Sequence, residues 1–71
     1  MKTVKRKKHW PEWAKYKATD IDGTRWLYKN KPMKYIDGWD FKESSPTNKV
    51  LKIKAKKNYK GNWKKSLRRI E

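Results

Sequence analysis

The sequence predicts one small α+β domain that is mostly β, with a three- to four-stranded antiparallel sheet and a short C-terminal helix. Two aspartate–glycine turns stand between runs of strand-forming residues, residues 50–56 alternate in polarity, and apolar residues recur at helical spacing near the C-terminus. A chain of 71 residues has room for one domain at most. We therefore expect a single domain over residues 10–71, preceded by a flexible basic arm over residues 1–9.

The arm is predicted from its charge. Residues 1–9 hold five Lys or Arg, no acid and no apolar periodicity that would attach them to a core. Trp10-Pro11-Glu12-Trp13 follows, and a proline before a glutamate can open one helical turn. An irregular aromatic anchor fits these four residues equally well.

Residues 15–19 and 24–28 predict a β-hairpin. Tyr16 and Ala18 fall on one face of the first strand, and Trp26 and Tyr28 share a face of the second. Residues 20–23, Asp-Ile-Asp-Gly, supply the turn because Asp and Gly tolerate positive φ. The same residues superficially resemble a calcium loop, but Lys29 stands where such a loop needs a bidentate glutamate.

A second hairpin is predicted around Asp37-Gly38, between residues 35–36 and 39–41. The tripeptide Ile-Asp-Gly thus occurs twice, at 21–23 and 36–38, with flanks that do not match. We interpret the pair as two similar turns and not as an internal repeat.

Residues 50–56 form the clearest predicted strand. Its apolar residues share one face, and its other face carries a ladder of amines from Lys52, Lys54 and Lys56, spaced about 7 Å apart. Further on, Asn62 fits the N-cap of a helix whose apolar stripe is Trp63, Leu67 and Ile70.

The composition favours a small core of aromatic rings. Only 34% of residues are apolar, but five Trp and four Tyr supply large surfaces for burial. We expect Trp13, Trp26, Trp39 and Trp63 to form that core. The absence of cysteine excludes disulfides, and no apolar run is long enough for a membrane span or a signal peptide, so we expect a soluble cytoplasmic protein.

The charge is concentrated at the two ends of the chain. The net charge is +15, of which residues 1–8 contribute +5, residues 9–48 only +1, and residues 49–71 +9. Self-repulsion of this size destabilises a compact state. A polyanionic partner is the simplest reason to keep it.

Short motifs occur in a characteristic order: Ala18-Thr19-Asp20-x-Asp22-Gly23, Trp26-x-Tyr28, Lys31-Pro32, Gly38-Trp39 and Trp63-x-x-Ser66-Leu67. With the tryptophan-led start, this order resembles small uncharacterised proteins encoded by tailed bacteriophages, over about residues 10–70. The resemblance implies a host-cell cytoplasm. Such proteins have no agreed activity, so it implies no site, but it makes two roles plausible: handling nucleic acid, or binding and inhibiting a host protein.

Largely sequence-independent binding to DNA or RNA is the first functional hypothesis. Phosphates would be contacted mainly by the C-terminal strand and helix, with help from the arm, and Tyr59 is placed to stack on an unpaired base. The candidate residues are Lys5, Arg6, Lys7, Lys8, Lys52, Lys54, Lys56, Lys57, Tyr59, Lys60, Lys64, Lys65, Arg68 and Arg69. Strand lysines also block edge-to-edge aggregation, which is the competing interpretation of the ladder.

The alternative hypothesis is an inhibitor that docks on an acidic surface of a host protein, for example a nucleic-acid enzyme. Trp39 and Phe41 would anchor it if they face solvent, because aromatic residues at exposed turns are typical interface anchors. They would otherwise cover the sheet. A membrane-surface role is disfavoured because the C-terminal apolar stripe is short.

Enzymatic activity is not expected. His9 is the only histidine and there is no cysteine, so a structural zinc site lacks ligands. No serine stands in a nucleophile elbow, and no glycine-rich phosphate loop is present. We therefore predict no catalytic residues, no metal and no cofactor.

Overall fold

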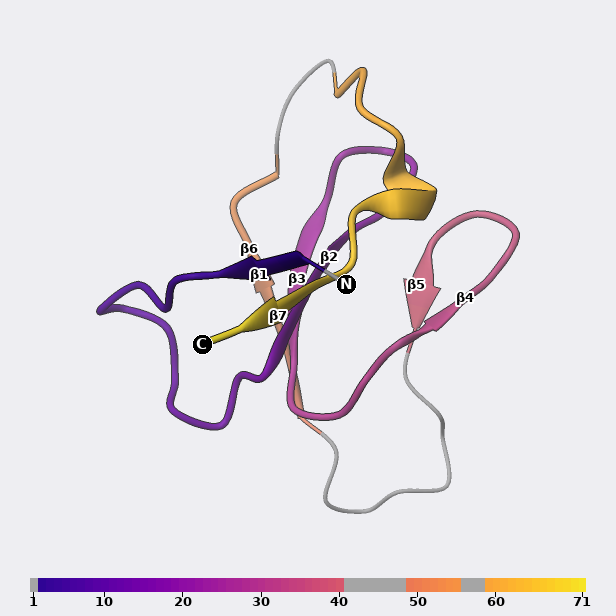
Figure 1. Cartoon of the computed structure of the whole chain (residues 1–71). Coiled ribbons are helices and arrows are strands. Elements are labelled where there is room, and N and C mark those ends of the chain that lie inside the picture. The colour runs from indigo at the N-terminus through magenta and orange to yellow at the C-terminus, as the bar shows by residue number, and fades with distance from the viewer. Residues whose placement is uncertain (1, 41–48, 56–58) are drawn as a thin grey trace.

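The computed structural model describes residues 2–40, 49–55 and 59–71. It contains a five-stranded sheet in the order β1-β7-β2-β3-β6 and a two-stranded sheet of β4 and β5, which confirms a mostly-β fold (Figure 1). The elements are β1 Lys2–Val4, β2 Tyr16–Thr19, β3 Arg25–Tyr28, β4 Met33–Lys34, β5 Trp39–Asp40, β6 Val50–Ile53, the 3-10 turn η1 Trp63–Lys65 and β7 Arg68–Ile70.

The hairpin of β2 and β3 is confirmed and lies at the centre of the larger sheet. Tyr16 pairs with Tyr28 and Ala18 with Trp26, as the predicted faces require. The turn closes through a bond from the Gly23 N–H to the Asp20 carbonyl at 3.0 Å, and Gly23 has a φ of 89°, a value that side chains rarely adopt.

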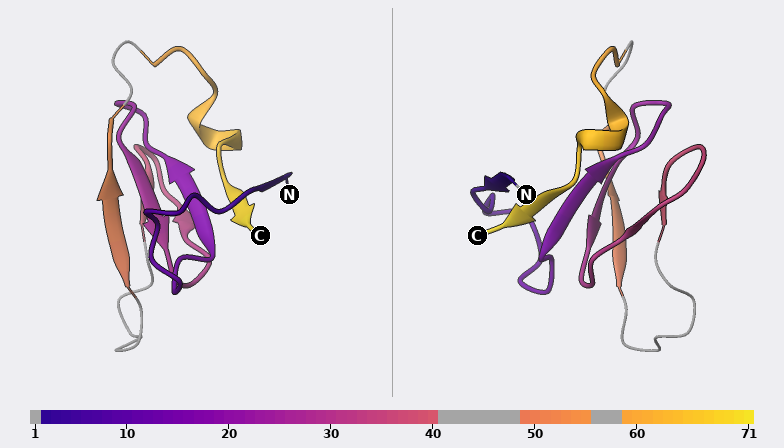
Figure 2. Two further views of the ribbon diagram at one scale, coloured as in Figure 1. Left: turned by 90° about the vertical axis from the view of Figure 1, so that its left-hand side faces the viewer. Right: turned by 45° about the vertical axis from the view of Figure 1, so that its right-hand side comes forward.

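The second hairpin is present around Asp37-Gly38, but its first strand is Met33–Lys34 and not the predicted residues 35–36, which lie in the turn region. β4 and β5 pair antiparallel, and the Tyr35 N–H donates to the Gly38 carbonyl at 2.8 Å across the turn. This hairpin stands apart from the five-stranded sheet in Figure 2.

The predicted strand at 50–56 is present but ends at Ile53. β6 pairs antiparallel with β3 and forms one edge of the sheet. Of the predicted ladder, Lys52 alone lies in the strand; Lys54 follows its end, and Lys56 lies outside the described residues. The ladder as predicted is therefore not a feature of this strand.

The predicted C-terminal helix is wrong. Asn62 caps a single 3-10 turn, Trp63–Lys65, and Arg68–Ile70 then forms β7 between β1 and β2. A two-turn helix gains little by itself. As a strand the segment gains backbone bonds instead, since the Ile70 N–H donates to the Lys15 carbonyl at 2.8 Å and the Glu71 N–H to that of Val4 at 2.9 Å.

The sheet is mixed and not purely antiparallel as predicted. Lys2–Val4, expected within a flexible arm, forms β1 and pairs parallel with β7, with Val4 opposite Ile70. The chain brings its first and last strands together, a long-range pairing for which a three-residue segment carries no local signal.

One cluster of buried hydrophobic residues lies on the face of the sheet that carries Leu27, which we name the Leu27 face. Leu27 is fully buried and clusters there with Trp10, Ala14 and Ile70; Val4, Trp13 and Ile53 pack around them. Residues 5–15 cross this face. Arg6 holds them in place through its guanidinium, which donates to the Pro11 carbonyl at 2.6 Å and the Ala14 carbonyl at 2.5 Å.

The opposite face, named the Tyr28 face, carries Trp26 and Tyr28 and is joined to the β4–β5 hairpin. Tyr28 is buried, and its hydroxyl donates to the Trp39 carbonyl at 3.2 Å. Of the four tryptophans expected in the core, Trp63 is buried and the other three are half-buried, whereas Trp10 is buried as well. Among the described residues, no helix has the length and apolar character that a membrane crossing requires.

Candidate nucleic-acid interface

Three cationic side chains lie side by side on adjacent strands of the Leu27 face. Lys2 pairs with Arg68 across β1 and β7, and Arg68 pairs with Lys17 across β7 and β2. Side chains of directly paired residues lie on the same face about 5 Å apart, and like charges there destabilise a sheet. Folding therefore brings cations together at a cost in stability.

A hollow of about 380 Å³ opens beside this row, and we name it the Lys17 hollow. Its charged lining consists of Lys17, Lys65 and Arg68, and its other lining residues are Val4, Thr19, Tyr59, Gly61, Asn62 and Ser66. A neighbouring hollow of about 420 Å³ shares two of the cations and adds Lys2. No carboxylate is among the described residues that line either one.

The positive charges around the Lys17 hollow repel one another. Lys17 is half-buried, and burial lowers the pKa of its amine, with further lowering by repulsion from Arg25, Lys7 and Arg68. The Lys17 and Lys7 amines both lie about 6 Å from the centre of the Trp10 ring, whose face attracts cations. An anion in the hollow would relieve the repulsion.

Local bonds hold the rim of the hollow. Ser66 Oγ accepts from the Thr19 N–H at 2.9 Å and lies within 3.0 Å of the Thr19 and Trp63 carbonyls, one of which takes its proton. The Asn62 side chain accepts from the Lys64 N–H at 3.1 Å. One terminal nitrogen of Arg68 donates to the Lys65 carbonyl at 2.6 Å.

Tyr59 is half-buried on the same rim. A Cβ built on Gly61 would come within 2.6 Å of the tyrosine hydroxyl oxygen, so the ring lies directly against the Gly61 backbone. The absence of a side chain at Gly61 permits this approach.

The structure brings three of the sequence-predicted site residues together, Tyr59, Lys65 and Arg68. It separates others. Arg69 alternates to the Tyr28 face, and Lys52 pairs with Trp26 on that face as well. The Arg6 guanidinium is engaged with backbone carbonyls, and the Lys64 amine lies 5.9 Å from the centre of the Trp63 ring.

The remaining predicted contacts line neither hollow. The Lys7 amine lies over the Trp10 ring. Four further predicted contacts are exposed and line neither hollow: Lys5, Lys8, Lys54 and Lys60. Lys57, Lys56 and Phe41 lie outside the described residues.

The sequence interpretation missed Lys2, Lys17 and Arg25. Alternation in residues 15–19 already sets Lys17 opposite to Tyr16 and Ala18, which was the available signal. The neighbours of Lys17 cannot be inferred from the sequence, because it predicts a helix at Arg68 and an unpaired arm at Lys2.

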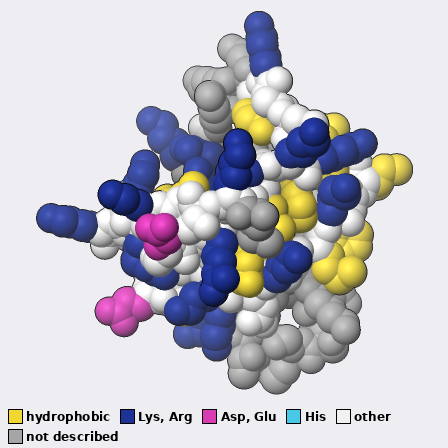
Figure 3. All heavy atoms as spheres, viewed as in Figure 1, with side chains coloured by type: hydrophobic (Ala, Val, Ile, Leu, Met, Phe, Trp, Pro, Cys, Tyr) yellow, Lys and Arg dark blue, Asp and Glu magenta, His cyan; other side chains and the backbone are white. Residues whose placement is uncertain are grey.

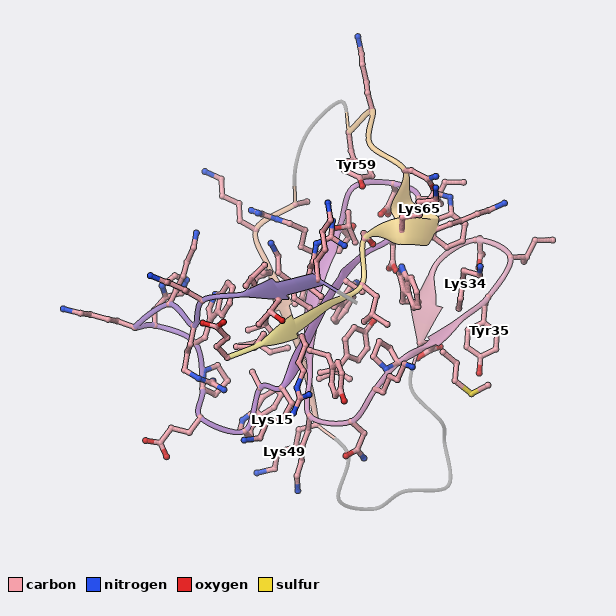
Figure 4. The ribbon with its side chains drawn as sticks, viewed as in Figure 1. Lys15, Lys34, Tyr35, Lys49, Tyr59 and Lys65 are labelled. Atoms are coloured by element: carbon pink, nitrogen blue, oxygen red, sulfur yellow. The ribbon has the colours of Figure 1, made fainter. Side chains whose placement is uncertain are left out.

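A second basic hollow, the Lys15 hollow, lies at the other end of the β2–β3 hairpin. Its volume is about 390 Å³, and its lining residues are Lys15, Tyr16, Lys29, Asn30, Lys31, Arg69 and Ile70. Figure 4 shows Lys15 and Lys49 at one end of the molecule and Tyr59 and Lys65 at the other. On the face seen in Figure 3, Lys and Arg side chains spread widely, and the visible Asp and Glu side chains lie toward one margin.

The acids gather elsewhere, in a cleft of about 610 Å³ between the two Ile-Asp-Gly turns, named the aspartate cleft. All four aspartates of the chain line it, and the complete lining is Asp20, Ile21, Asp22, Tyr35, Ile36, Asp37, Gly38, Trp39 and Asp40. Within residues 2–40, 49–55 and 59–71, no group of three or more His, Asp or Glu is placed to hold a metal ion.

Asp20 ties the two turns together. Its carboxylate accepts from the Trp39 N–H at 2.8 Å and from the Trp26 indole N–H at 3.0 Å. Burial raises the pKa of Asp20; the two hydrogen bonds oppose the rise, and Asp22 and Asp40 add to it. A Cβ at Gly38 would lie 2.8 Å from the same carboxylate, so glycine permits the close approach.

Trp39 is not the solvent-facing anchor that the inhibitor hypothesis considered. It is half-buried, and its indole N–H donates to the Trp63 carbonyl at 3.0 Å. The exposed apolar residues near it are Ile21, Met33, Tyr35 and Ile36.

Comparison of the chain with protein-family models, with curated proteins and with solved structures gives no match.

Proposed function

We propose that this chain binds nucleic acid through phosphate contacts, largely independently of base sequence. The observation that carries the proposal is the row of Lys2, Arg68 and Lys17 on adjacent strands, which continues into the Lys17 hollow beside Lys65. Repelling cations that are held together without a lining carboxylate favour a bound anion. The net charge of +15 makes a polyanion the fitting partner.

The proposed contact surface differs from the C-terminal strand and helix that the sequence predicts. The Leu27-face cations come from both ends of the chain and from the central hairpin, so the contact depends on the assembled sheet. Guanidinium and ammonium groups are the usual donors to phosphate oxygens. Tyr59 on the rim adds a ring on which an unpaired base would stack.

Titration of a labelled 20-base-pair duplex at two salt concentrations tests the proposal. We expect a Kd of about 1–100 μM near physiological salt, with a steep loss of affinity as salt rises. The variant Lys17→Gln/Arg68→Gln should lower the log–log salt slope by about 2, since each phosphate contact contributes about 0.9.

The matched control is Lys34→Gln/Lys49→Gln, which removes the same charge from two exposed lysines that line neither the Lys17 hollow nor its neighbour. It should keep the wild-type slope. Thermal melting establishes that both variants are folded. Absence of binding at low salt, affinity that does not change with salt, or equal slopes for the two variants would contradict the proposal.

A second candidate is docking on an acidic host-protein surface, because Arg68 and its neighbouring lysines fit carboxylates as well as phosphates. Capture from nuclease-treated bacterial lysate distinguishes the two. A single stoichiometric protein that is lost with Lys17→Gln/Arg68→Gln would favour the second candidate, and nucleic acid recovered without nuclease treatment favours the first.

A further inference from the structure

The aspartate cleft has an exposed apolar rim. Ile36 is 93% exposed, and Ile21 and Tyr35 are about half exposed beside it. Three large apolar side chains around one hollow are characteristic of a surface that binds another molecule. Figure 4 places Tyr35 on the β4–β5 hairpin beside Lys34, away from the end that carries Lys15 and Lys49 and from the end that carries Lys65.

The acids around this rim select a cationic occupant. Asp22 and Asp37 line the same cleft as Ile21 and Ile36, one pair from each turn. The Thr24 N–H donates to the Asp22 carboxylate at 2.9 Å and lowers its pKa, so this carboxylate stays charged at neutral pH. An apolar rim with anionic neighbours fits a surface that combines apolar side chains with cations.

The Lys15 hollow of a second copy is such a surface. Four cations line it, together with the half-buried ring of Tyr16. A symmetric contact of two aspartate clefts would instead oppose Asp37 to its own copy. The favourable contact is therefore cleft against hollow, and copies aligned along one nucleic acid can make it head to tail, a heterologous arrangement that continues from one copy to the next.

Such a contact leaves the nucleic-acid surface free. Tyr16 and Arg69 of the Lys15 hollow lie on the Tyr28 face, and Trp39, which lines the aspartate cleft, bonds to Tyr28 on that face; no described residue of either docking surface also lines the Lys17 hollow or its neighbour. Lys17 and Arg68 lie on the Leu27 face. A copy can thus contact phosphates and two neighbouring copies at once.

Two free copies of net charge +15 repel each other, whereas copies on a nucleic acid have much of that charge neutralised. We propose that neighbouring copies on one nucleic acid bind cooperatively, with the aspartate cleft of each against the Lys15 hollow of the next. The inference rests on the proposed function.

The experiment compares a duplex long enough for one copy with a duplex long enough for two, the lengths being set by saturation stoichiometry. Native gels give the affinity of the second binding step relative to the first, a ratio in which changes of overall charge largely cancel. For the wild type we expect the second step to be favoured about tenfold. The acid-end variant Ile36→Ser/Asp37→Lys and the basic-end variant Lys15→Glu/Lys31→Glu should each lose this preference.

An equimolar mixture of the two variants should regain doubly occupied duplex, because the basic hollow of one variant is intact and so is the cleft of the other. The charge-matched control Lys5→Glu/Lys8→Glu, at exposed lysines that line neither surface, should keep the preference. Thermal melting establishes that every variant is folded.

Independent filling of the longer duplex by the wild type would overturn the inference and leave the proposed function standing. Retained cooperativity in either variant, or no recovery in the mixture, would also overturn it. Absence of salt-sensitive binding to the one-copy duplex would overturn both.

Discussion

The Lys17 hollow and the aspartate cleft each gather like charges, but the fold treats them differently. In the cleft, Asp20 accepts one hydrogen bond from the Trp39 N–H that joins the two hairpins and one from the Trp26 indole within its own hairpin, and Asp22 accepts one that closes its turn. In the hollow, Lys17 is half-buried among Arg25, Lys7 and Arg68, all of which disfavour its charge. Part of the acid cluster therefore forms hydrogen bonds that contribute to folding, although burial disfavours the charge of Asp20, whereas the cation cluster costs stability that the proposed phosphate contacts would offset.

The largest expected effect on stability comes from removing the Asp20 carboxylate of the aspartate cleft. Asp20→Ala removes the acceptor for the Trp39 and Trp26 N–H groups and separates the two turns. Because bonds to a charged group contribute about 1.5–3 kcal/mol each and burial of the carboxylate offsets part of this, we expect a loss of about 2 kcal/mol. Urea denaturation measures it.

The control for that experiment is Asp37→Ala, at an exposed position in the second turn of the same cleft. It should change stability by less than about 0.5 kcal/mol. Equal losses for the two variants would show that Asp20 has no special role in joining the hairpins.

The cation side should respond in the opposite direction. Lys17→Met keeps an unbranched side chain and removes a charge that is paired directly with Arg68. Relief of one like-charge pair should stabilise the free protein by about 0.5 kcal/mol, while the salt slope for duplex binding falls by about 1. Lower stability together with unchanged binding would mean that Lys17 serves folding and not the ligand.

The smallest expected effect is a dependence on pH. The pKa of Lys17 is lowered on folding, so the unfolded chain holds this proton more tightly as pH approaches 10.5. Stability of the wild type relative to Lys17→Met should therefore rise as pH increases from 7 toward 10.

Asp20 gives the opposite behaviour at acid pH. Its pKa is raised on folding, so the folded chain holds the proton more tightly, and the wild type should gain stability relative to Asp20→Asn as pH falls from 7 toward 3.8. Paired denaturation curves of the wild type and each variant measure both trends. A difference in stability that stays flat over either interval would contradict the assigned cause.

Much of the fold was accessible from local sequence. Both aspartate–glycine turns, the alternation of Tyr16 and Ala18, and the capping role of Asn62 depend on residues close together in the chain, and all three are present. The C-terminal strand was not accessible, because the spacing of Trp63, Leu67 and Ile70 satisfies a helix. Pairing of Arg68–Ile70 with β1 and β2 outweighed that local preference.

The candidate site was accessible only in part, for the same reason. Lys65, Arg68 and Tyr59 were expected to meet a polyanion, whereas Lys2 and Lys17 join them through strand pairings that span almost the whole chain. The predicted lysine ladder fails because β6 ends at Ile53 and Lys52 lies on the other face.

By itself the sequence determined the excess of positive charge, the two turns and the central hairpin, since each is a property of composition or of neighbouring residues. Tertiary structure alone decided which cations stand together. Pairing of β7 with β1 and with β2 set Lys2, Arg68 and Lys17 side by side, because register in a sheet fixes both the neighbours of a side chain and the face on which it lies.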